Sequence, residues 1–293
     1  MQNEERGPRA EDDEKQTAGE KQPAILLRPT ALRPPTGQLQ VDGAQDLIGR
    51  LLDCWLLARC TRGHRMFGTS SREKAYFGPF LTFLAFIALG ELIGKLFDGQ
   101  DAGWALRKPS YWIYPLQTLV CGGLLARWWR HYELRWPARP VFTVCIGILV
   151  LVLWVAPQQW FHATPRLEGF EPAFFGGGAA YAVNLVFRFV RMTIVVPLLE
   201  EIFWRGFLLR YLIQPDFTRV PIGTFSWLSF ALVTAGFCFE HAMPDWPAAV
   251  LAGMLYNAVA YRTRSLSACV LAHAVTNFLL GLYVLRTGQW GFW

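Results

Sequence analysis

From residue 76 onward, long apolar stretches alternate with short polar connections. About 20 apolar residues in a helix cross a bilayer, with a usable range of roughly 17–25. The pattern therefore predicts an all-α, polytopic membrane protein with about eight transmembrane helices. We expect these helices at residues 77–97, 111–128, 141–157, 173–190, 193–213, 225–241, 246–261 and 266–285.

The fourth and fifth of these stretches are nearly continuous in sequence. One helix of about 40 residues would be longer than the bilayer is thick, since a helix rises about 1.5 Å per residue. We therefore expect a break at the charged residues Arg188 and Arg191.

The chain divides by composition into four parts. Residues 1–45 contain clustered acids and prolines and no aromatic residue, which predicts a disordered cytoplasmic tail. Apolar residues recur at helical spacing in the juxtamembrane segment 46–75, which predicts an amphipathic helix on the membrane surface or on the cytoplasmic face of the bundle. Residues 76–160 hold the N-terminal transmembrane helices, and residues 170–290 hold the part that carries the chemistry described below.

Charge and cysteine content narrow the functional class. The net charge is +6, but the basic residues flank apolar stretches, as the positive-inside rule predicts for cytoplasmic loops. We therefore expect no nucleic-acid partner, and an even number of spans places both termini in the cytoplasm. The six cysteines include no CxxC pair, so we expect neither a disulfide framework nor a cysteine zinc site.

Three charged residues, Glu200, Glu201 and Arg205, lie inside one apolar stretch. A charge near the bilayer centre costs about 2.5–3.5 kcal/mol on insertion scales, so such residues usually mark a functional site. Glu201 and Arg205 are one helical turn apart and are expected to pair. Glu200 has no local cation, and a buried carboxylate without a cation binds a proton more readily, as a general base must.

Two further polar pairs recur at one-turn spacing in later apolar stretches. Phe237 and His241 share one helix face, and His273 and Asn277 share another. Histidine and asparagine can donate hydrogen bonds to a developing oxyanion. Together with Glu200, these residues provide the groups needed to add water to a peptide carbonyl.

The order EExxxR, FxxxH and HxxxN on separate transmembrane helices resembles the CAAX-protease and bacteriocin-processing (CPBP) family of intramembrane endopeptidases. The resemblance covers roughly residues 170–290. It implies that Glu200 and His241 activate water and that His273 and Asn277 form the oxyanion hole, whereas Glu201, Arg205 and Phe237 support these residues. Glu200, His241 and His273 could also hold a divalent metal such as zinc with an open position, and the sequence leaves the cofactor undecided.

The first half of the chain is similar to a bacterial subgroup of CAAX prenyl protease-related proteins that is associated with exosortase sorting systems. The similarity lies in the aromatic segments 111–115 and 127–130. It implies a multi-pass protein of the bacterial inner (cytoplasmic) membrane, a membrane-associated protein or peptide as substrate, and a link to an exosortase system. The alternative is a non-catalytic transporter, or an immunity or scaffold protein, that uses the same buried polar residues for binding.

Overall fold

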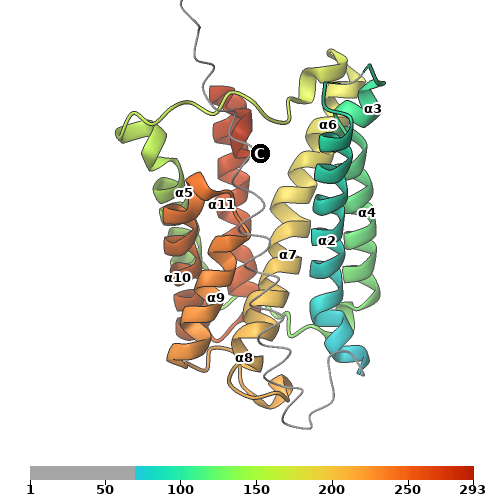
Figure 1. The fold of residues 1–293 in the computed structure, drawn as a ribbon. Helices are drawn as coiled ribbons and strands as arrows, with labels where there is room; N and C mark the ends of the chain where they lie inside the picture. Colours follow the sequence, from blue (N-terminus) through green and yellow to red (C-terminus); the bar gives the residue numbers. More distant parts are fainter. Residues whose placement is uncertain (1–69, 100) are drawn as a thin grey trace, which may run out of the picture. The chain divides into compact units, whose positions relative to one another are not determined.

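The computed structural model describes residues 70–99 and 101–293, and within these ranges the chain forms helices and no strand (Figure 1). The all-α prediction is therefore confirmed for the described part of the chain. The predicted tail of residues 1–45 and the amphipathic segment up to residue 69 lie outside the described residues.

The first group of helices comprises α2 (Ser71–Leu96), α3 (Trp104–Arg107) and α4 (Ser110–Arg127). α2 begins with a capping box, in which the Ser70 hydroxyl accepts the Glu73 backbone N–H at 3.1 Å and the Glu73 carboxylate accepts the Ser70 N–H. α2 packs along α4.

The second group comprises α5 (Pro140–Trp160), α9 (Trp227–Phe239), α10 (Trp246–Thr263) and α11 (Leu266–Thr287), with α5 packed on α10 and α11. α5 and α11 approach very closely at Gly147, where a Cβ atom would lie 2.5 Å from the carbonyl oxygen of Ala272. Only glycine permits this approach. The Thr276 hydroxyl donates to the Gly147 carbonyl at 2.8 Å and links the two helices.

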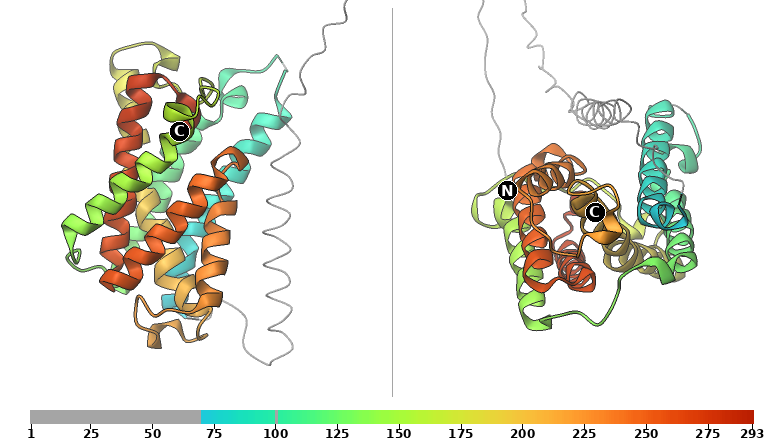
Figure 2. Two further views of the ribbon diagram at one scale, coloured as in Figure 1. Left: turned by 90° about the vertical axis from the view of Figure 1, so that its left-hand side faces the viewer. Right: turned by 90° about the horizontal axis from the view of Figure 1, so that it is seen from below.

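A single long helix, Ala179–Tyr211, runs between the two groups and contacts α2, α4 and α11 (Figures 1 and 2). It consists of α6 (Ala179–Val190), α7 (Val196–Glu201) and α8 (Leu209–Tyr211), joined by two π-helical segments, η3 (Arg191–Val195) and η4 (Ile202–Leu208). Four short 3-10 turns lie in the described connections between helices: η1 (Trp129–His131), η2 (Pro172–Phe175), η5 (Phe217–Arg219) and η6 (Met243–Asp245). A fifth, η7 (Trp290–Phe292), follows α11.

The predicted break at Arg188 and Arg191 is wrong. Both residues lie within the long helix and are only 3% and 8% exposed. The Arg191 Nε atom donates to the Gln117 side-chain carbonyl at 2.7 Å, and both guanidinium groups lie over the Tyr114 ring, at 4.8 and 4.3 Å from its centroid. α4 thus accommodates the two charges by a hydrogen bond and by cation–π contacts, so the helix need not end at them.

The predicted number of eight spans is not confirmed. Four helices are long and apolar enough to cross a membrane among the described residues, namely α2, α5, Ala179–Tyr211 and α11. The long helix has 33 residues and therefore a length of about 50 Å, more than the hydrocarbon layer of about 30 Å. α9 has only 13 residues and ends at Phe239, so it is shorter than the predicted span 225–241.

The two π-helical segments flank the short helix α7, which carries Glu200 and Glu201. In a π-helical turn the Met192 carbonyl would bond to the amide five residues later, but that residue is Pro197, which has no N–H. The Met192 carbonyl is thereby left available to a side chain from another helix. The Asn277 amide of α11 donates to it at 2.9 Å.

Candidate active site

The Glu201–Arg205 pair is the buried anchor of the site. Both side chains are 0% exposed, and Arg205 Nη1 lies 2.9 Å from Glu201 Oε1, so the predicted pairing is confirmed. The remaining Arg205 donors bond to the Asn257 side-chain oxygen at 3.0 Å and to the Gly253 carbonyl at 3.1 Å, both on α10. Its guanidinium carbon lies 4.9 Å from the centroid of the Phe237 ring. The guanidinium nitrogens thus have hydrogen-bond acceptors, and the guanidinium plane has an aromatic neighbour. These contacts offset part of the free-energy cost of burying the charge.

His273 contacts both glutamates. Its Nδ1 atom lies 2.9 Å from Glu201 Oε1, and its Nε2 atom lies 4.0 Å from Glu200 Oε2. Because Glu201 is held as a carboxylate by Arg205, it accepts a hydrogen bond, which places a proton on His273 Nδ1. The imidazole stacks on the Tyr256 ring with centroids 5.0 Å apart, so its plane is fixed as well as its tautomer.

Glu200 is 5% exposed, and its Oε2 atom is buried without a hydrogen-bond partner among the described residues. A buried carboxyl oxygen that lacks a donor is costly, and such groups are retained mainly where they have a function or hold water. Glu201 Oε2 is likewise buried without a partner among the described residues, but Glu201 Oε1 is bound by Arg205 Nη1 and His273 Nδ1 at 2.9 Å, whereas Glu200 Oε2 lies 4.0 Å from His273 Nε2.

His241 lies just beyond the end of α9, two residues after Phe239. Its Nδ1 atom is 2.8 Å from the Phe237 carbonyl oxygen, which can only accept, so Nδ1 carries the proton and Nε2 of the neutral ring is an acceptor. The ring packs against the Phe237 and Trp154 side chains, with centroids 4.9 and 5.1 Å away. The Phe237 ring also lies 6.2 Å from the His273 ring and thus packs near both imidazoles.

The segment that follows His241 is held in place by two contacts. The Trp246 indole N–H donates to the His241 carbonyl at 3.0 Å, and Arg166 forms an ion pair with Asp245 at 2.7 Å. Burial raises the pKa of Asp245, and the Arg166 charge opposes this shift. His241 therefore does not need a longer α9 to fix its position.

The predicted residues are not all in contact. Hydrogen bonds join Glu201, Arg205 and His273, Glu200 Oε2 lies 4.0 Å from His273 Nε2, and the Phe237 ring packs against both Arg205 and His241. Asn277 lies one turn after His273 on α11, and its side-chain hydrogen bond is to the Met192 carbonyl.

Sequence reasoning missed the contribution of α10. Asn257, Gly253 and Tyr256 surround Arg205 and His273, and Asn257 also donates to the Thr234 hydroxyl at 3.1 Å. A polar asparagine inside an apolar helix was a usable signal for a buried partner. The positions of a glycine carbonyl and of a tyrosine ring could not be inferred from spacing.

The candidate metal ligands do not fit a zinc ion in this arrangement. Within the two described ranges, no group of three or more histidine, cysteine or acidic side chains is placed to hold a metal ion. Zinc binds nitrogen and oxygen ligands at about 2.0–2.2 Å in a tetrahedron. The 4.0 Å between His273 Nε2 and Glu200 Oε2 would put the metal nearly on the line that joins them.

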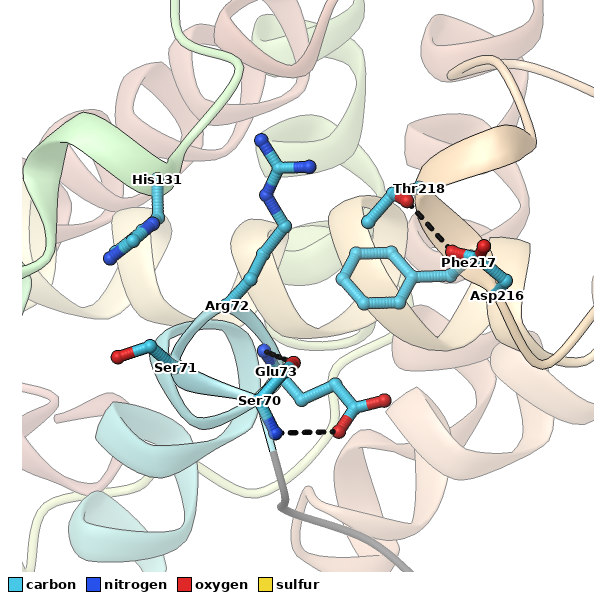
Figure 3. Close-up of a pocket in the computed structure, with 8 residues that line it drawn as sticks. All are labelled: Ser70, Ser71, Arg72, Glu73, His131, Asp216, Phe217 and Thr218. Carbon is cyan, nitrogen blue, oxygen red and sulfur yellow. Dashed lines mark hydrogen bonds between the residues drawn. The ribbon is translucent and has the colours of Figure 1, made fainter. Parts of the chain in front are cut away.

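Two cavities lie elsewhere in the protein. The first, of about 460 Å³, is lined by residues at the start of α2, by His131 and by residues 216–218 (Figure 3). The second, of about 440 Å³, is lined by residues of the α2–α4 connection and by Phe174. Neither lining contains a candidate catalytic residue.

Comparison with protein families gives a match over residues 182–279 to the family described as "Type II CAAX prenyl endopeptidase Rce1-like". The match covers 98 of the 293 residues and shows that this stretch is similar to the Rce1-like family. The stretch contains all seven candidate residues, from Glu200 to Asn277, and confirms the family resemblance deduced from the motifs. Neither the curated proteins nor the solved structures include a match to the chain.

The matched stretch begins within α6 and ends within α11, so α2, α3, α4 and α5 all precede it in the chain. The preceding helices nevertheless contribute to the packing around the site, through Trp154 beside His241 and Gly147 beside Thr276. Together, the family match and the apolar helices show a membrane protein.

Proposed function

We propose that this chain is an intramembrane endopeptidase that hydrolyses a peptide bond in a membrane-associated protein or peptide. The observation that carries the proposal is the contrast between two adjacent buried glutamates within the stretch similar to the Rce1-like family. Glu201 Oε1 is bound by both Arg205 and His273 at 2.9 Å, whereas Glu200 Oε2 has no hydrogen-bond partner among the described residues and lies 4.0 Å from His273 Nε2.

Glu200 acts as the general base in this mechanism, assisted by His241. The free carboxyl oxygen of Glu200 accepts a proton from water, and the unprotonated Nε2 of His241 orients the same water by accepting its second hydrogen. The hydroxide then attacks the scissile carbonyl carbon. General-base catalysis of this kind contributes about 10²–10⁴-fold to the rate.

His273 and Asn277 stabilise the oxyanion that forms. The Nδ1–H of His273 is bound to Glu201, which fixes the ring, and Nε2 donates to the oxyanion when the ring is doubly protonated. One N–H of the Asn277 amide is held by the Met192 carbonyl, which fixes the amide and leaves its second N–H for the oxyanion.

The substrate class and the cellular setting follow from the family resemblance. We propose that the protein resides in a bacterial inner membrane with both termini in the cytoplasm and acts alongside an exosortase sorting system. The family description names a CAAX prenyl endopeptidase, so a prenylated peptide that ends in a CAAX sequence is the first probe to use.

Profiling of protein N-termini tests this function in cells. New N-termini from membrane-associated proteins should appear with the wild type and be lost with Glu200→Gln, which keeps the size of the side chain. Glu168→Gln, which alters an exposed carboxylate in the α5–α6 connection, is the matched control and should behave as the wild type. A Glu200→Gln profile identical to the wild type would contradict the proposal and favour a non-catalytic binding function.

A further inference from the structure

Glu240, next to His241 in sequence, is a half-buried acid with no role in the mechanism proposed for Glu200 and His241. Its Oε2 atom accepts the indole N–H of Trp204 at 3.0 Å. Its Oε1 atom is buried and has no hydrogen-bond partner among the described residues. One half of this carboxyl group is thus held in place, and the other half is free.

Trp204 is itself locked against α9. A Cβ atom on Gly236 would lie 2.8 and 2.9 Å from two atoms of the Trp204 ring, so the indole packs directly against the glycine. Gly236 and Glu240 are one helical turn apart, which brings the indole N–H to the carboxylate. Trp204 also lies one turn after Glu200 on the long helix. The indole therefore fixes Glu240 relative to the helix that carries the proposed base.

Glu240 belongs to the same electrostatic cluster as the site. Its charge interacts with those of Glu200, Glu201 and Arg205. Where carboxyl groups share an apolar site, repulsion between them leaves at least one protonated. Arg205 and His273 hold Glu201 as a carboxylate, so a shared proton belongs to Glu200 or Glu240.

We propose that Glu240 is a second catalytic carboxyl group, which donates a proton to the amine that leaves when the peptide bond breaks. This inference rests on the proposed endopeptidase function. It assigns the base and the acid to different side chains, Glu200 on the long helix and Glu240 beyond α9.

The reaction balances with these two groups. Glu200 takes a proton from water, and the hydroxide oxygen forms a bond to the carbonyl carbon. The C–N bond then breaks, and its electron pair takes the Glu240 proton, so that a neutral amine and a carboxylic acid are released. Transfer of the proton from Glu200 to Glu240 through water restores the starting state.

A substrate whose leaving group needs no proton distinguishes a proton donor from a residue that only supports the fold. Loss of a proton donor should slow cleavage of an amide but not of such a substrate. The probe is an internally quenched, prenylated CAAX peptide, made once with the scissile amide and once with a thioester in its place. A thiol with a pKa of about 8.5 leaves as a thiolate without a proton donor. Glu240→Gln should slow amide cleavage about 10²-fold or more and thioester cleavage less than about threefold.

The controls distinguish the two proposals. Glu200→Gln should slow both probes, because both need activated water, and Glu168→Gln should slow neither. Equal losses on amide and thioester with Glu240→Gln would overturn the role of Glu240 and leave the endopeptidase function intact. If wild type and Glu200→Gln have the same rate on both probes, the proposed function fails and the inference fails with it.

Two further measurements do not depend on the Glu240→Gln rate. Trp204→Phe keeps a ring against Gly236 but removes the N–H, and should lower amide cleavage selectively. The infrared spectrum of the wild type should contain a buried carboxylic acid band that Glu240→Gln lacks. If the two spectra have the same acid bands, Glu240 is ionised and cannot be the proton donor.

Discussion

Replacement of Arg205 by methionine should destabilise the protein strongly. The change removes a guanidinium group that is 0% exposed and bonded to Glu201, Asn257 and Gly253. Methionine has a similar length and no charge, so the loss is mainly electrostatic. It leaves the Glu201 carboxylate buried with His273 as its remaining hydrogen-bond donor.

The expected cost is about 3–5 kcal/mol, because removal of one partner of a buried ion pair leaves an uncompensated charge. The Asn257 oxygen and the Gly253 carbonyl lose their donors in addition, which adds to this figure. For a domain of about 150–250 residues, 1 kcal/mol corresponds to about 2–4 °C in Tm. The midpoint of thermal unfolding should therefore fall by roughly 6–20 °C.

The assay is thermal unfolding of purified protein in detergent, followed by tryptophan fluorescence. Arg219→Met is the matched control, because Arg219 pairs with Asp216 at 2.8 Å but its side chain is 76% exposed. An exposed pair is worth less than about 1 kcal/mol, so this variant should unfold close to the wild type. If Arg205→Met and Arg219→Met had the same midpoint, the Glu201–Arg205 pair would not be the anchor of the site.

Three further substitutions test the packing around the site. Gly147→Ala should lower the free energy of unfolding by about 1–3 kcal/mol, since its Cβ would lie 2.5 Å from the Ala272 carbonyl oxygen. An unchanged midpoint of thermal unfolding would mean that α5 and α11 do not approach this closely at Gly147. Tyr256→Phe removes one buried hydrogen bond of 2.8 Å and should cost about 1 kcal/mol in the same assay, with a loss above 3 kcal/mol contradicting this estimate. Pro197→Ala restores a backbone N–H that competes with the Asn277 amide for the Met192 carbonyl. Peptide cleavage should therefore slow while the protein remains folded. Cleavage at the wild-type rate would refute the idea that the Met192 carbonyl positions Asn277 for the oxyanion.

The parts of the site that sequence could predict are local ones. Glu201 and Arg205 pair because residues four apart lie on one helix face, and the sequence spacing determines this directly. The same reasoning placed His273 and Asn277 on one helix. The all-α class followed from the length of the apolar stretches.

The parts that could not be predicted depend on contacts between distant segments. The break expected at Arg188 and Arg191 is absent, because Gln117 and Tyr114 of α4 accommodate their charges. Likewise, the role of Glu240 emerges only when Trp204 is seen to reach it. Periodicity along one segment contains no information about which side chains of another helix will meet it.

Cleavage by purified protein in lipid vesicles tests the central claim most directly, with the prenylated CAAX peptide as probe and Glu200→Gln compared with the wild type. Our account predicts that Glu200→Gln unfolds at the same temperature as the wild type and cleaves about 10²–10⁴-fold more slowly. Equal cleavage rates for the two proteins would contradict it.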